Sequence, residues 1–339
     1  MEKPLRILVI GIARIGDTLL LTPVFQAIKE NLPNTHLTVI AHPNRCSVLE
    51  NLPSIDTLWG TTKNWLVWQG WLGGKTYDVA LVYGRDLKLL KYAQRVSHKI
   101  YCFDEKIFQT ITDESVHKVP LPKIPIHAVH ERLLLIQAWL RANSMPQRLS
   151  YMVTEAEKQK AQQWLQNAGL ASTHPLIGLQ TNSFPTKSHR DWPASHFKAL
   201  IRALLTTFPK AHFLILGDAL AAEKGKTYLA DFPDNVSIAA GQMSLRQSAA
   251  LMSQLDLYVG VDTGPTHLAG ALGIPMVAMY HPRYPGQYLM PLDNPTCRVV
   301  EHPRFVANKH RDDAMSSIQP GEVKNSAIML LKYNLREQS

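Results

Sequence analysis

Short runs of β-branched and other apolar residues alternate with helical patterns along this chain, and the alternation forms two series. Strands that alternate with helices in this way are typical of parallel α/β sheets. The first series predicts strands at 6–10, 36–41, 56–59, 78–83 and 99–103. The second predicts strands at 176–179, 213–216, 236–238, 257–261 and 276–279. We therefore predict an α/β protein made of two doubly wound, Rossmann-like domains.

The length supports this division, because 339 residues are too many for a typical single core. A segment with three prolines at 119–126 is predicted to be a connector. The predicted domains are residues 1–165 and 166–320, and an amphipathic helix at 321–339 is expected to pack back towards the N-terminal domain. Parallel sheets bind ligands beyond the carboxyl ends of their strands, so functional residues should follow strands.

The first candidate site is the turn after the first strand, with the sequence Gly-Ile-Ala-Arg-Ile-Gly-Asp. Gly11 and Gly16 let the backbone turn and approach a ligand, and the helix that follows offers free amides at its N-terminus. The spacing matches neither the dinucleotide fingerprint nor a P-loop. Asp17 is the notable side chain, although capping of the helix is the commoner role for an aspartate in such a place.

The second candidate site is the turn after the strand at 257–261, followed by a predicted helix. Asp262 and Thr263 are good capping residues, Gly264 permits close approach, and Pro265 suits the first helical position. The free amides would hold a pyrophosphate without a metal ion, and His267 would add a donor from the first turn. The alternative is an ordinary capped helix with a packed histidine.

A third candidate is the basic loop at 187–193, between the first strand of the second series and its helix. Lys187 and Arg190 would neutralise phosphate charge as a sugar leaves. The alternative is that Trp192 and Pro193 fix the start of the helix while the charges are solvated.

These elements resemble those of a known family. Gly16-Asp17, Arg190-Asp-Trp-Pro193 and Asp262-Thr-Gly-Pro-Thr-His-Leu-Ala269 are similar in order and spacing to motifs of the lipopolysaccharide heptosyltransferases, glycosyltransferase family nine. The resemblance covers nearly the whole chain and includes its ending at 315–323. It implies a GT-B fold, in which two Rossmann-like domains face each other across a cleft. It also implies transfer of a heptose from ADP-heptose to the inner core of lipopolysaccharide, with inversion at the anomeric carbon.

The resemblance further implies roles for single residues. Asp17 matches the family's proposed general base, and it would take the proton of the acceptor hydroxyl. Thr263, Gly264 and His267 match the donor-diphosphate site, which Asp262 adjoins, and Pro265 and Lys187 are grouped with them. Arg190 stands where the family usually has lysine, which keeps the charge but changes its shape and donor geometry. Glu223 is similar to a family acid near the donor ribose, and a plain acid at a helix start is the equal alternative.

The residues that bind the acceptor are predicted from the charge of the chain. The formal net charge of +9 favours an anionic partner, and no nucleic-acid-binding module is present. Basic residues and a glycine in loops or helix starts of the N-terminal domain are candidates to meet core phosphates or acidic sugars, although each charge is more often simply solvated. These candidates are Arg14, Gly16, Lys63, Arg85 and Lys88.

An aromatic-rich stripe follows Lys63, at Trp65, Trp68, Trp71 and Leu72. The favoured interpretation is a helix that faces the core. The alternative is contact with a membrane surface, as in an interfacial helix.

No Asp-x-Asp pair follows a strand, and the histidines and cysteines show no metal-binding spacing. We therefore expect no metal and no cofactor besides the donor substrate. No segment has the length and apolarity of a signal peptide or a membrane span. The expected location is cytoplasmic, with peripheral contact to the inner membrane left open.

Two other classes of protein stay open at this point. A nucleotide-sugar epimerase would bind a donor without an acceptor, and a non-catalytic nucleotide- or glycan-binding protein would bind without turnover. A dehydrogenase is disfavoured, because the glycine fingerprint and the ribose-binding acid are missing.

Overall fold

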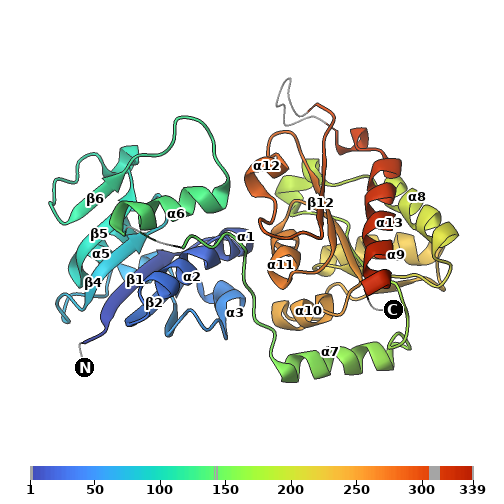
Figure 1. Ribbon diagram of the computed structural model, residues 1–339, viewed down its shortest axis with the longest axis horizontal. Coiled ribbons are helices and arrows are strands. Elements are labelled where there is room, and N and C mark those ends of the chain that lie inside the picture. The colour runs from blue at the N-terminus through green and yellow to red at the C-terminus, as the bar shows by residue number, and fades with distance from the viewer. Residues whose placement is uncertain (1–2, 141, 143, 305–313, 338–339) are drawn as a thin grey trace. The chain divides into compact units, whose positions relative to one another are not determined.

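The computed structural model describes residues 3–140, 142, 144–304 and 314–337. The chain divides into two compact units, Met1–Met152 and Val153–Ser339, and each is described by itself (Figure 1). The division falls before the expected boundary at 165, because helix α7 (Glu155–Asn167) packs on α10 (Leu245–Met252) of the second unit. An ion pair joins the two helices, with Nη2 of Arg246 2.7 Å from Oε2 of Glu157.

The first unit contains a six-stranded parallel sheet with the strand order β3-β2-β1-β4-β5-β6. Its strands are β1 (Leu5–Gly11), β2 (Thr35–Ala41), β3 (Thr57–Gly60), β4 (Tyr77–Val82), β5 (Ser97–Phe103) and β6 (Val116–Val119). Its α-helices are α1 (Ile15–Leu19), α2 (Thr22–Asn31), α3 (Cys46–Leu49), α4 (Lys63–Leu66), α5 (Leu87–Val96) and α6 (Ala128–Trp139). The order reverses between β1 and β4, so the switch point that binds ligands in such sheets lies at their carboxyl ends.

The second unit contains a parallel sheet with the order β12-β11-β10-β7-β8-β9. Its strands are β7 (Leu176–Gln180), β8 (His212–Leu216), β9 (Val236–Ile238), β10 (Leu257–Val261), β11 (Met276–Tyr280) and β12 (Cys297–Glu301). The remaining α-helices are α8 (Ala194–Thr207), α9 (Ala219–Asp231), α11 (Gly264–Leu272), α12 (Gly286–Leu289) and α13 (Pro320–Glu337). Counted along the chain, both sheets have the same strand order, and here the switch point lies between β7 and β10.

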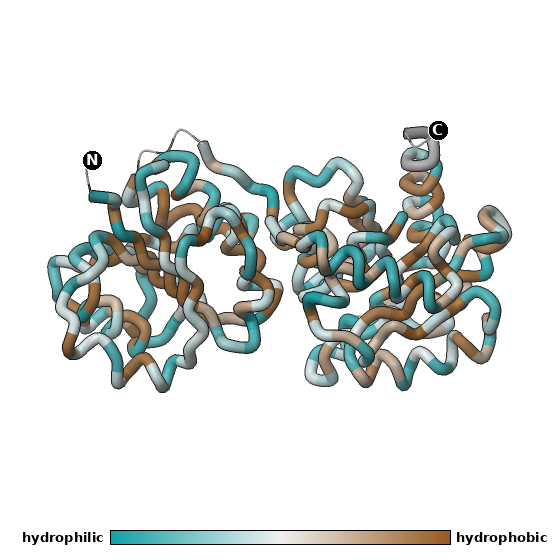
Figure 2. The backbone as a smooth tube through the Cα atoms, turned by 90° about the horizontal axis from the view of Figure 1, so that it is seen from below, coloured by the Kyte–Doolittle hydropathy of each residue, from teal (hydrophilic) through white to brown (hydrophobic). Residues whose placement is uncertain are grey.

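Burial explains the strand sequences. Every residue of β7, β8, β10 and β11 is buried, which is expected for parallel strands covered by helices on both faces. Figure 2 shows the hydrophobic stretches running through the interior of each unit. Among the helices of the described ranges, none is long and apolar enough to span a membrane.

All ten predicted strands are confirmed, and the predicted connector begins where β6 ends. The final helix, α13, belongs to the second unit and packs on α8 and β11. One expectation is corrected. The stripe at 65–72 does not face the core, because Trp65, Trp68, Trp71 and Leu72 are all more than 60% exposed. The edge strands β6 and β12 were not predicted at all.

Candidate functional site

The turn after β1 presents Asp17 at the carboxyl end of the first sheet. Helix α1 begins at Ile15 with Arg14 as its N-cap, and Asp17 lies in the first turn without capping the helix. The capping interpretation is therefore wrong. Gly11 ends β1 and leaves room for Leu21, whose Cδ1 would lie 2.4 Å from a Cβ at this position. The glycine thus lets the chain turn tightly before Asp17.

Asp17 is held at one carboxylate oxygen and is otherwise accessible. Its side chain is 49% exposed, and Nη2 of Arg132 on α6 lies 2.9 Å from its Oδ1. A second nitrogen of Arg132, Nη1, donates to the carbonyl of Ala128 and so fixes the guanidinium. The ion pair therefore orients Asp17 without burying it.

A hollow of about 200 Å³ lies beside this pair. It collects residues that follow three neighbouring strands, β1, β4 and β5, which is where ligands bind in doubly wound sheets. Among the residues that line it are Gly11, Asp17, Tyr83, Arg85, Glu105 and Arg132. Arg85 pairs there with Glu105 at 2.6 Å. The first unit thus combines an exposed carboxylate with an open polar hollow.

The predicted acceptor residues divide into two places. Arg14, Gly16 and Arg85 belong to the turn and the hollow around Asp17. Lys63 and Lys88 lie together at the starts of α4 and α5 instead. Lys63 is 3.4 Å from Asp86, the N-cap of α5, and Lys88 donates to the side chain of Asn64 at 2.6 Å.

In the second unit, Asp262 follows β10 and is the centre of a buried charge cluster. Its side chain is 4% exposed, and Nη1 of Arg190 lies 2.8 Å from its Oδ2. The guanidinium of Arg190 also stacks on Tyr284, and Cζ of Arg190 lies 3.9 Å from the centroid of the tyrosine ring. Lys187 and Arg283 lie within 6 Å of the same ring. Three cations thus surround one tyrosine beside the buried carboxylate.

The start of α11 adjoins this cluster. Thr263 is the N-cap in an extended conformation, and its carbonyl accepts hydrogen bonds from the amides of Thr266 and His267. Pro265 has no N–H, and the amide of Gly264, the first helical residue, has no partner within a helix. The helix N-terminus therefore offers a free donor with a partial positive charge.

His267 does not lie open beside these amides. The residue is 6% exposed, and its Nε2 is 3.6 Å from Oδ1 of Asp262. Its Nδ1 is buried and has no hydrogen-bond partner among the described residues. The histidine therefore belongs to the buried cluster around Asp262, and it would act on a ligand through that carboxylate or through the helix start.

The basic loop fixes the start of α8, as one of the two interpretations predicted. Trp192 is buried, its Nε1 donates to the carbonyl of Ile318 at 2.9 Å, and Pro193 is the N-cap of α8. Arg190 is nevertheless not solvated, because it pairs with Asp262. Glu223 is 69% exposed on α9 and pairs with Lys226 at 2.6 Å. It lies beyond the first turn of the helix, so it is not the helix-start acid of the alternative interpretation.

Sequence reasoning missed several residues of both sites. Arg132 and Tyr284 had no local signal, because their contacts depend on packing. The polar stretch after β7 could have been noticed, since four buried polar residues, Gln180, Thr181, Asn182 and Ser183, follow an apolar strand. Oε1 of Gln180 and Oδ1 of Asn182 are buried without a hydrogen-bond partner within the described part of the chain.

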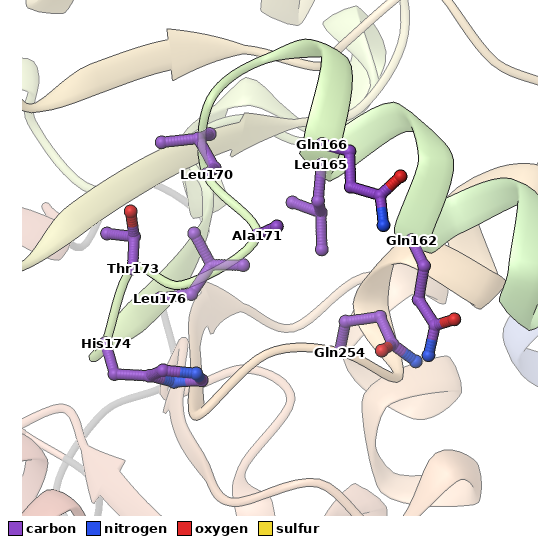
Figure 3. Close-up of a pocket in the computed structure, with 9 residues that line it drawn as sticks. All are labelled: Gln162, Leu165, Gln166, Leu170, Ala171, Thr173, His174, Leu176 and Gln254. Atoms are coloured by element: carbon purple, nitrogen blue, oxygen red, sulfur yellow. The ribbon is translucent and has the colours of Figure 1, made fainter.

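A further hollow lies at the opposite edge of the second sheet (Figure 3). It has a volume of about 270 Å³ and lies between the end of α7 and the amino end of β7. His174 lines it and pairs with Asp256 at 2.8 Å. Because ligands of parallel sheets bind at the carboxyl ends, this hollow is not the candidate site. Within the described ranges, no group of three or more metal-ligating side chains is present.

The sequence is similar to those of known glycosyltransferases. Residues 68–318 match the family model of glycosyltransferase family 9 (heptosyltransferase). The chain is 25% identical to lipooligosaccharide heptosyltransferase 2 of Haemophilus ducreyi, over 94% of this chain and 93% of that protein. It is 24% identical to lipopolysaccharide heptosyltransferase 3 of Escherichia coli, over 78% of this chain and 80% of that protein.

Solved structures share the fold. The glycosyl transferase family 9 protein from Veillonella parvula aligns with a TM-score of 0.84 and 20% identity, over 98% of this chain and 99% of that one. The E. coli ADP-heptose LPS heptosyltransferase II aligns with a TM-score of 0.76 and 21% identity, over 99% of this chain and 100% of that one. The two units are therefore the Rossmann-like domains of a GT-B fold.

Proposed function

The chain belongs to glycosyltransferase family 9, the heptosyltransferases, and from this premise we propose that it transfers a heptose from ADP-heptose to the inner core of lipopolysaccharide. The similar E. coli heptosyltransferase II is named for ADP-heptose, and the similar curated proteins are named for lipopolysaccharide or lipooligosaccharide. Family membership does not favour an epimerase or a non-catalytic binding protein.

The observation that carries the donor assignment is the cation cluster around Tyr284. Lys187, Arg190 and Arg283 gather at one ring, next to the free amide at the start of α11. Asp262 and Tyr284 fix Arg190 from two sides, so its charge is already positioned. A diphosphate would meet these donors without a metal ion, and they would stabilise the charge that develops as ADP leaves.

For the chemistry, we assign Asp17 as the general base. The acceptor oxygen attacks the anomeric carbon, its proton passes to Asp17, and the bond to the diphosphate breaks with its electron pair going to ADP. Attack from the face opposite to the leaving group inverts the anomeric configuration. Arg132 occupies only Oδ1 of Asp17, so Oδ2 is the oxygen that would take the proton.

The test is a transfer assay with ADP-heptose and a heptose-free core acceptor, in which ADP release and the anomeric configuration of the product are measured. We expect stoichiometric transfer with inversion, and the same rate with EDTA present. A change of the donor without an acceptor would indicate an epimerase. Stabilisation of the protein by ADP-heptose without any transfer would indicate a binding protein. Loss of activity in EDTA would contradict the metal-independent scheme.

A further inference from the structure

Four large apolar side chains of the first unit lie in solvent within eight residues of sequence. Trp65 is 61% exposed, Trp68 78%, Trp71 68% and Leu72 completely. We call these four residues the tryptophan surface. Exposed apolar clusters on folded proteins commonly mark a contact with a partner or a membrane.

The segment is anchored on its other side, so the exposure does not result from poor packing. Leu66 is fully buried. Gly70 has a φ of +77° and lies so close to α5 that a Cβ would be 2.8 Å from Cγ1 of Val96. The guanidinium of Arg95 donates to the carbonyls of Gln69 at 2.9 Å and Leu66 at 2.8 Å. These contacts hold the backbone against α5 while the tryptophans stay exposed.

The local backbone places the first two indoles, those of Trp65 and Trp68, on a common side. The amide of Trp68 donates to the carbonyl of Trp65 at 3.1 Å, and residues three apart eclipse each other in such a turn. The side chain of Trp71 is also fixed, because its Nε1 donates to the carbonyl of Val67 at 3.0 Å. Arg95 also lies 4.6 Å from the centroid of the Trp71 ring. The tryptophan surface is therefore a formed feature of the fold.

The chain on either side of this surface is basic, although Lys63 and Arg85 pair with Asp86 and Glu105. Residues 60–99 contain seven lysines and arginines against two aspartates. Lys63 begins α4, and Lys88 reaches the same helix through its 2.6 Å hydrogen bond to Asn64. Lys75 follows the tryptophan surface, and Lys91 lies one turn before Arg95 on α5; both are exposed.

From this combination we infer that the tryptophan surface docks on a lipid bilayer that contains anionic headgroups. Indoles prefer the boundary between water and hydrocarbon, where their apolar rings are buried and their N–H groups stay hydrated. Lysines beside them attract negatively charged lipid, and the two effects add in interfacial binding. The charge complementarity favours a bilayer over an uncharged protein partner. The inference goes beyond sugar transfer and does not depend on which sugar is moved.

Co-sedimentation of the full chain with vesicles tests the inference. The probes are phosphatidylcholine vesicles with and without phosphatidylglycerol, at low salt. We expect binding to the anionic vesicles and a blue shift of the tryptophan emission. The variant Trp68→Ser/Leu72→Ser should bind about tenfold more weakly. The control Ile124→Ser removes a 77% exposed apolar residue elsewhere in the same unit and should bind like the wild type.

Thermal stabilisation by ADP, measured on each variant, shows that it is folded and separates this test from the donor assignment. Wild-type protein that stays in the supernatant with anionic vesicles overturns the inference. So does a double variant that sediments as the wild type does, since binding would then be by charge alone.

Discussion

Asp17 in the first unit and Asp262 in the second are alike in sequence context but differ in exposure. Asp17 lies in the first turn of the helix after β1 and Asp262 directly after β10. Each pairs with one arginine, at 2.9 Å for Asp17 and 2.8 Å for Asp262. The side chain of Asp17 is 49% exposed and lines a hollow, whereas that of Asp262 is 4% exposed. Burial, and not the ion pair itself, separates the two carboxylates.

This difference in exposure suits the two carboxylates to different roles. An exposed carboxylate can contact a substrate and exchange a proton with it. A buried carboxylate paired with arginine is costly to disturb, because removal of one partner leaves an uncompensated charge. Under the proposed function, Asp262 would therefore position Arg190 for the donor, while Asp17 would be free to react. The following variants test whether the two aspartates differ in this way.

The largest effect is expected for Asp17→Asn. The amide cannot take a proton, so kcat should fall by about 10²- to 10⁴-fold. Its carbonyl oxygen still accepts a hydrogen bond from Arg132, and the site is half exposed, so the thermal unfolding midpoint should change little. Turnover and thermal unfolding, measured side by side, check both points. Near-normal turnover would remove Asp17 from the role of base.

Breaking the buried pair of Arg190 and Asp262 should lower the stability of the fold. Arg190→Ala leaves Asp262 with only His267 beside it, at 3.6 Å, and we expect a loss of about 3 kcal/mol in the free energy of unfolding, together with weaker binding of ADP. Urea unfolding and ADP titration measure the two effects.

The double variant Arg190→Ala/Asp262→Asn is the matched control. It removes the uncompensated charge, so it should recover part of the stability but none of the ADP affinity. A single variant as stable as the wild type would show that burial does not make this pair structurally important.

Arg132 is expected to be a positioning residue, because it holds the carboxylate of Asp17 in place. Arg132→Ala leaves the carboxylate free to rotate, and kcat should fall about tenfold through lost orientation. KM for ADP-heptose should stay the same, and Arg132→Lys should restore much of the rate. A purely structural role would instead lower stability and leave the kcat of the folded protein unchanged.

The sequence predicted more of the framework than of these contacts. The ten strands and the turns that carry Asp17 and Asp262 follow from local periodicity and turn residues. Strands β6 and β12 were missed because His117, Lys118 and Arg298 interrupt their short apolar runs. Arg132 lies 115 residues from Asp17, and no local pattern encodes a contact that depends on how α6 packs.

The exposure of the tryptophans was mispredicted for a related reason. Their spacing matches an apolar helix face, but Arg95 and Gly70 anchor the opposite side of the segment to α5. Helix α4 ends at Leu66, so helical periodicity could not place Trp68 and Trp71, and the tertiary contacts of the segment decide their exposure.

The smallest effect is expected at a third arginine–carboxylate pair, Glu157 with Arg246, which lies away from the strand ends. Arg246 hydrogen-bonds Glu157 and lowers the pKa of its carboxyl to about 2, and Glu157 also completes the capping box of α7 with Thr154. A depressed carboxyl pKa stabilises the fold above the ordinary pKa, near 4.5, and this contribution is lost as the pH falls towards 2. Glu157→Gln should therefore cost about 1 kcal/mol at neutral pH and much less near pH 2, with turnover unchanged. Urea unfolding at the two pH values measures the difference, and an equal deficit at both would mean that Glu157 acts by its shape as a cap and not by its charge.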